Sequence, residues 1–113
     1  MKIFDTTSNT IIAHNARLAD TVISRMVGLL NRRSLCEGEA LVITRCNSIH
    51  MFFMRFAIDV VFVGRTNNVV GLIKKIQPFR LSPIFWKAVY AIELPAGTIE
   101  DKNILIGDRI QLV

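Results

Sequence analysis

The chain has 113 residues, of which 51% are hydrophobic and 20% are charged, and this length predicts a single domain over residues 1–113. Six glycines and three prolines exclude collagen and low-complexity disorder. Because the formal net charge is +5, the composition favours anionic partners over cationic ones.

The most apolar stretch runs from Ile49 to Gly64 and is interrupted by three charged or titratable side chains. It is shorter than the roughly 20 apolar residues that a membrane-spanning helix needs. The N-terminal ten residues also lack the apolar core of a secretory signal. We therefore predict no membrane span and a cytoplasmic protein, with loss of a preceding secretory segment as the alternative.

The sequence predicts one main helix and a series of strands. Asp20 or Thr21 can cap a helix whose apolar residues follow at helical spacing, which predicts one main helix near residues 21–31. A turn at residues 64–68 joins two runs rich in β-branched residues and predicts a hairpin. The predicted strands are residues 1–4, 11–14, 40–44, 48–56, 57–63, 69–76 and 88–94, followed by a helical turn in 97–103 and a last strand before residue 113.

These elements predict the α+β class, mainly antiparallel β. About seven strands and one main helix suggest a curled sheet or a small β-barrel.

Charge is distributed unevenly along the chain. From Ala40 to Ile92 there are seven cations and a single anion, Asp59, so this region carries a local charge of +6. The basic 40–92 region would attract phosphates. Within it, residues 79–87 interleave aromatic side chains with cations, a pattern that can stack nucleobases. Two alternatives require no nucleic acid. The cations can form a solvated basic face, and the aromatic side chains of the loop can pack against the edge of the core.

The segment from Cys46 to Asp59 contains the residue types of a catalytic site but not their usual spacing. Cys46 and His50 would lie about 13 Å apart along a strand, beyond hydrogen-bond reach. The chain has no Gly-x-Ser-x-Gly elbow and no His-x-x-x-His spacing. We therefore predict no catalytic residue, metal ligand or cofactor, and a hydrolase that uses His50 with Asp59 is only a second alternative.

Three charged residues lie among apolar neighbours. Arg55 and Asp59 flank a short apolar run, and Glu93 lies within a predicted strand. Buried charges need partners, so these side chains are expected to be at least partly buried and close together. They form either a structural ion network or the lining of a pocket.

Several segments together resemble the domain-of-unknown-function family 192. They are RMVGLLNRRSL from Arg25, SIHMFFMRFAIDVVFV from Ser48, VVGLIKKIQP from Val69, IELPAG from Ile92, and the Gly107-Asp108 pair. The resemblance covers roughly residues 19–112. Ala57, Arg65 and the start of the helix, which lacks a glutamate, depart from the family pattern.

The resemblance implies a small β-rich α+β domain, secreted in some members, with no established reaction or cofactor. It implies that the motif residues are Arg25, His50, Met51, Met54, Arg55, Asp59, Glu93 and Gly97.

The functional hypothesis is a non-enzymatic binding module with a semi-buried pocket for a small anionic ligand or a peptide. Arg25 and Arg55 would hold the anion, His50 would donate a hydrogen bond, and two carboxylates would orient the arginines. The alternative is a nucleic-acid-associated accessory protein that uses the basic 40–92 region. The sequence does not define an oligomeric state. The expected ligand-binding residues are Arg25, His50, Met54, Arg55, Asp59 and Glu93.

Overall fold

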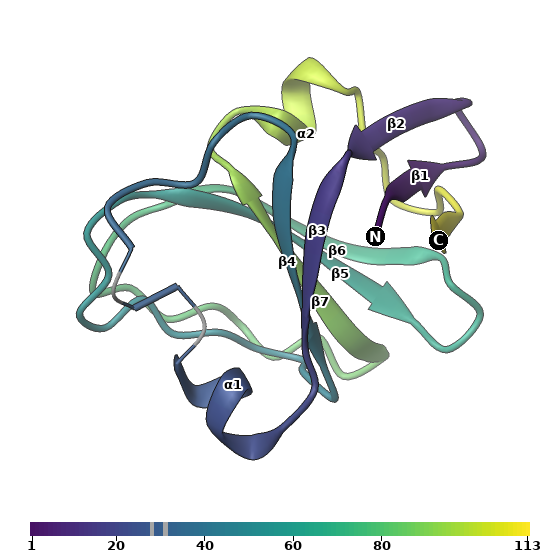
Figure 1. Cartoon of the computed structure of the whole chain (residues 1–113). Coiled ribbons are helices and arrows are strands. Elements are labelled where there is room, and N and C mark those ends of the chain that lie inside the picture. Colours follow the sequence, from purple (N-terminus) through teal and green to yellow (C-terminus); the bar gives the residue numbers. More distant parts are fainter. Residues whose placement is uncertain (28, 31) are drawn as a thin grey trace.

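The computed structural model describes residues 1–27, 29–30 and 32–113. Gly28 and Asn31, which belong to the predicted main helix, lie outside the described residues. The elements, in chain order, are β1 (Ile3–Asp5), β2 (Thr10–Ala13), β3 (Asn15–Ala19), α1 (Val22–Val27), β4 (Glu39–Thr44), β5 (Ile58–Gly64), β6 (Val69–Ile76), β7 (Ala88–Pro95), α2 (Thr98–Asp101) and β8 (Ile110–Leu112) (Figure 1).

The strands form two sheets. A five-stranded sheet has the order β3-β4-β7-β5-β6 and a three-stranded sheet has the order β2-β1-β8. All pairings are antiparallel except β3 with β4, which confirms the mainly antiparallel prediction. Neither order returns to its first strand, so within the described part of the chain neither sheet closes. The barrel prediction is corrected to two separate sheets.

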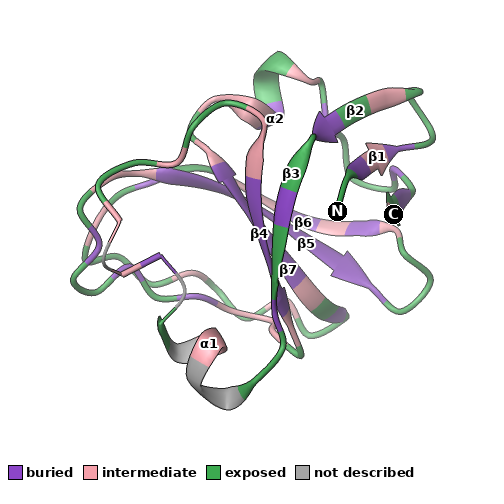
Figure 2. Ribbon diagram, in the orientation of Figure 1, coloured by how far each residue is buried: buried purple, intermediate pink, exposed green. Residues whose placement is uncertain are grey.

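Apolar clusters cover both faces of the five-stranded sheet at β5. All seven residues of β5 are buried (Figure 2). On one face, Val61 belongs to an apolar cluster with Ile3 and Ile110 of the small sheet. On the other face, Phe62 belongs to a cluster with Leu29 and Met51. The sequence of a strand that is buried on both sides is a nearly continuous apolar run, because neither face is exposed to solvent.

The helix α1 begins as the sequence predicts but ends earlier. The backbone N–H of Ser24 donates to Thr21 Oγ1, and the N–H of Thr21 donates to Ser24 Oγ, both at 3.0 Å. This reciprocal cap confirms Thr21 as the start. The helix spans six residues, and the N–H of Leu30 bonds the Val27 carbonyl three residues back. Leu29 and Leu30 therefore lie in a turn.

The predicted strand at residues 48–56 is wrong. The segment is a loop with an isolated β-bridge between His50 and Leu81. Met51 and Met54 are both buried, and a strand would direct residues three apart to opposite faces. The chain instead turns, since the Met54 N–H donates to the Met51 carbonyl at 3.3 Å. Phe53 adopts a φ of 63°, which also interrupts an extended strand.

The other predicted elements are present within one or two residues, including the β5–β6 hairpin and the helical turn α2. The sequence prediction missed β3, whose buried residues are the small Ala16 and Ala19. Within the described ranges, the structure contains no helix with the length and apolar character needed to cross a bilayer.

Candidate functional site

The candidate site is a pocket between α1 and the segment 45–50 that follows β4. Its outer part is an open hollow of about 350 Å³, and its inner part is a more enclosed cavity of about 90 Å³. The two parts share five lining residues, so we treat them as one feature, the α1 pocket. The shared residues are Arg25, Ile43, Cys46, Ser48 and His50.

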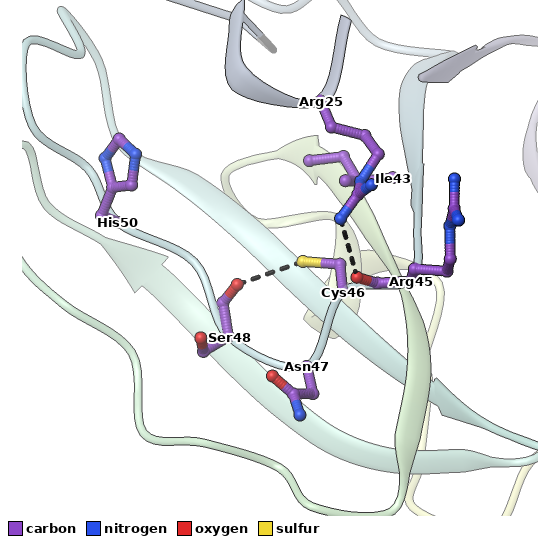
Figure 3. Close-up of a pocket in the computed structure, with 7 residues that line it drawn as sticks. All are labelled: Arg25, Ile43, Arg45, Cys46, Asn47, Ser48 and His50. Atoms are coloured by element: carbon purple, nitrogen blue, oxygen red, sulfur yellow. Dashed lines mark hydrogen bonds between the residues drawn. The ribbon is translucent and has the colours of Figure 1, made fainter. Parts of the chain in front are cut away.

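Arg25 extends from α1 across the outer hollow toward the end of β4 (Figure 3). Its Nη2 donates to the carbonyl oxygen of Arg45 at 3.3 Å. Arg45 has a φ of 50°, and its own Nη2 donates to the Asp20 carbonyl at 3.4 Å. Arg25 Nε is buried and has no hydrogen-bond partner among the described residues. Two guanidinium groups therefore line the hollow, and one retains an unused buried donor.

Glu93 lines the inner cavity from β7. Its neighbours across the sheet are Leu41 and Val60, both apolar, and the residue is only 7% exposed. Burial raises the pKa of Glu93 to about 7, because an apolar environment disfavours the charged form. Its Oε2 has no hydrogen-bond partner in the described part of the chain. Arg25 and Glu93, which both line the inner cavity, therefore each hold a buried polar atom without a hydrogen-bond partner among the described residues.

Cys46 lies beside both groups and remains a neutral thiol. Burial raises the pKa of Cys46, and the nearby Glu93 raises it further, whereas Arg25 lowers it. The Sγ donates to the Ser48 carbonyl oxygen at 3.1 Å (Figure 3). Since a thiolate and not a thiol is the nucleophile, this arrangement does not activate Cys46 for covalent chemistry.

His50 and Met54 complete the lining expected from the sequence. Met54 is buried and lines the inner cavity, while His50 is exposed and lines both parts. The His50 ring stacks on Phe52 with 5.5 Å between the ring centroids, and it lies apart from the other six residues drawn in Figure 3.

Asp59 lies on the opposite face of the central sheet. It is paired with Leu94, whereas the neighbouring Val60 is paired with Glu93, and adjacent residues of a strand point to opposite faces. Asp59 is fully buried. Its Oδ1 accepts the Lys75 N–H and its Oδ2 accepts the Ile99 N–H, both at 2.8 Å. Asp59 therefore connects β6 and α2, and no arginine among the described residues forms an ion pair with it.

The expected cluster of Arg55, Asp59 and Glu93 does not form. Arg55 is exposed, does not line either part of the α1 pocket, and has no ion pair within the described residues. The prediction that Arg55 is partly buried is wrong, because the loop at residues 46–57 lets its side chain reach water. The sheet itself separates Asp59 from Glu93. For the same reason, Asp59 is not available to His50 as a catalytic partner.

Three residues that were not expected from the sequence also line the outer hollow: Arg45, Asn47 and Ser48. One signal for Arg45 was available, since it is the first residue after the predicted strand at 40–44 and a cation there would lie at the end of the sheet. No group of three or more His, Cys, Asp or Glu side chains with the proximity of metal ligands occurs among the residues that the structure describes.

Two packed open sheets, with a pocket beside a short helix, define a small β-rich protein. A family model described as "DUF192: Uncharacterized ACR, COG1430" matches residues 3–112. The chain belongs to this uncharacterised family, which confirms the resemblance seen in the sequence.

Similar proteins cover nearly all of the chain. A UPF0127 protein of Pyrococcus furiosus is 35% identical over 112 residues, 96% of each chain. A UPF0127 protein of Thermococcus sibiricus is 35% identical over 112 residues, which is 96% of this chain and 72% of the relative. The crystal structure of a protein of unknown function from Novosphingobium aromaticivorans is 20% identical. It aligns with a TM-score of 0.85 over 98% of this chain and 82% of that one, a similarity of fold alone.

Proposed function

We propose that this protein is a non-catalytic binding module whose α1 pocket takes a small organic anion, either free or at the end of a peptide. The observation that carries the proposal is the pair of unpaired buried polar atoms, Arg25 Nε and Glu93 Oε2, in residues that line one cavity. A buried polar group without a partner costs about 1–3 kcal/mol. An occupant that bonds to both groups would recover part of that cost.

The charges around the pocket favour an anion. Arg25, Arg45 and His50 line the outer hollow, and no carboxylate of the described residues does so. A guanidinium is well suited to carboxylate and phosphate groups because it offers several N–H donors in one plane. Glu93 supports the same ligand class at pH values below about 7, since a protonated carboxyl can donate a hydrogen bond to an anion.

Arg25, Glu93, His50 and Met54 take distinct roles in the proposed site. Arg25 binds the anion, and Glu93 in its protonated form donates a second hydrogen bond. His50 donates at the mouth of the pocket, and Met54 supplies an apolar contact in the inner cavity. Arg55 and Asp59 have no ligand contact in this scheme, and Arg45 takes the place first expected for Arg55.

The test uses three probes near pH 6: acetate, N-acetylglycine as a mimic of a peptide C-terminus, and inorganic phosphate. We expect at least one probe to raise the melting temperature in a saturable way, because a ligand that binds only the folded state stabilises it. Arg25→Gln should remove this shift. The matched control is Arg109→Gln, since Arg109 is exposed and does not line the α1 pocket.

Two results would overturn the proposal. One is that none of the three probes changes the melting temperature or the backbone amide spectrum of the wild-type protein. The other is that Arg25→Gln and Arg109→Gln respond to the probes as the wild type does.

A further inference from the structure

A second hollow lies at the β5–β6 hairpin and shares no lining residue with the α1 pocket. Its volume is about 450 Å³, within the usual range for small-molecule sites. We call it the Trp86 groove, and its lining residues that matter here are Arg65, Thr66, Asn68, Val70, Trp86 and Lys87.

Trp86 is 80% exposed, although tryptophan is usually well buried in folded proteins. A smaller hollow of about 330 Å³ adjoins the groove and shares Val70, Trp86 and Lys87 with it. Trp86 therefore borders open space on two sides, and its indole is available for stacking.

The exposed Trp86 follows a firmly anchored neighbour. The Phe85 ring stacks on Phe62 of β5 with 4.4 Å between centroids. It also lies against the backbone of Gly71, where a methyl group would overlap the ring. The Phe85 N–H donates to the Asn47 carbonyl and the Ala88 N–H donates to the Phe85 carbonyl, both at 2.8 Å. These contacts of Phe85 fix the backbone next to Trp86, so that the exposed indole has a defined position.

Both charged residues that line the groove are cations. Arg65 and Lys87 are exposed, and no carboxylate of the described residues lines either hollow. The polar turn residues already bond to one another, since the Thr66 hydroxyl donates to Asn68 Oδ1 at 2.6 Å. Recognition would therefore depend on one aromatic ring and two cations, a combination typical of binding that tolerates many sequences.

We propose that the Trp86 groove binds single-stranded nucleic acid, with an unpaired base stacked on Trp86 and phosphates contacted by Arg65 and Lys87. A duplex fits less well, because stacking on an indole requires a base that is free of its own stack. A neutral carbohydrate could also stack on Trp86, but it would make no use of the two cations. The binding is expected to be weak and without sequence preference.

The experiment relies on Trp86 being the single tryptophan of the chain, so its fluorescence reports on the groove directly. We expect a twelve-residue oligothymidylate to quench this fluorescence at low salt. The logarithm of the association constant should fall with the logarithm of salt with a slope of about −1.4, because each neutralised phosphate of a single strand contributes about −0.7.

Variants are compared by the anisotropy of a labelled oligothymidylate. Trp86→Ala should weaken binding about 5- to 150-fold, and Arg65→Gln or Lys87→Gln should each reduce the salt slope by about 0.7. The matched control is Arg17→Gln, because Arg17 is exposed on β3, the opposite edge strand from β6.

The absence of quenching by oligothymidylate at low salt would overturn the proposal. So would binding that the groove variants and Arg17→Gln weaken equally. Quenching by a neutral oligosaccharide but not by oligothymidylate would overturn it in favour of a carbohydrate site.

Discussion

Replacing Glu93 with glutamine tests the electrostatics of the α1 pocket. The pKa of Glu93 is raised from 4.5 to about 7 by burial, so the folded state holds a proton that the unfolded state releases at lower pH. Below pH 4.5 both states are protonated and the burial carries no electrostatic cost. As the pH rises from 4.5 to 7, the unfolded state releases this proton while the folded state keeps it. The free energy of unfolding therefore falls with pH, by about 3 kcal/mol in total for this difference between the two pKa values.

Glu93→Gln cannot ionise, so it should lose this part of the pH dependence. The assay is urea denaturation of both proteins at several pH values between 4.5 and 8.5. The free energy of unfolding of the variant, relative to the wild type, should increase by about 3 kcal/mol across that range. Glu37→Gln is the matched control, since Glu37 is exposed. A difference between Glu93→Gln and the wild type that stays constant with pH would refute the reasoning.

Three further predictions concern the framework around the two pockets. Asp59→Ala should lower the free energy of unfolding by about 2–4 kcal/mol in urea denaturation, because it leaves the N–H groups of Lys75 and Ile99 without their acceptor; a loss no larger than that of the exposed Asp101→Ala would contradict this. Gly71→Ala should destabilise by about 1–3 kcal/mol through overlap with the Phe85 ring, and an unchanged melting temperature would show that the ring moves freely. The pKa of Asp5 is raised by burial and by its contact with Asp108, so the wild type should lose stability as the pH rises through the pKa of folded Asp5. Asp108→Asn should flatten that loss, and equal pH profiles for the two proteins would count against the coupling.

Local patterns in the sequence predict the elements that depend on local chemistry. Thr21 caps α1 as its position suggests, and the turn residues after Gly64 join β5 to β6 as expected. These features are set by neighbours within a few residues. The parallel strand β3 is different, because its pairing with β4 depends on a partner more than twenty residues away and its buried residues are only alanines.

The candidate site could be predicted only in part. Four of the expected residues line the α1 pocket: Arg25, His50, Met54 and Glu93. The predicted proximity of Glu93 and Asp59 is wrong, because the strand register places their side chains on opposite faces of the sheet. A shift of one residue decides which face a side chain occupies, and the sequence does not reveal the register of β5 against β7. The predicted burial of Arg55 is wrong for another reason. The apolar run around it suggests a strand, whereas the buried Met51 and Met54 require a turn that directs Arg55 to the surface.

The most direct test of the account is the pH dependence of N-acetylglycine binding, measured by titration calorimetry between pH 6 and 9. If the anion lies between Arg25 and a protonated Glu93, the association constant should fall above pH 7, approaching about tenfold per pH unit. Binding should also be accompanied by proton uptake. In Glu93→Gln the association constant should remain nearly constant over the same range. A wild-type affinity that does not change with pH, or that rises above pH 7, would contradict the account.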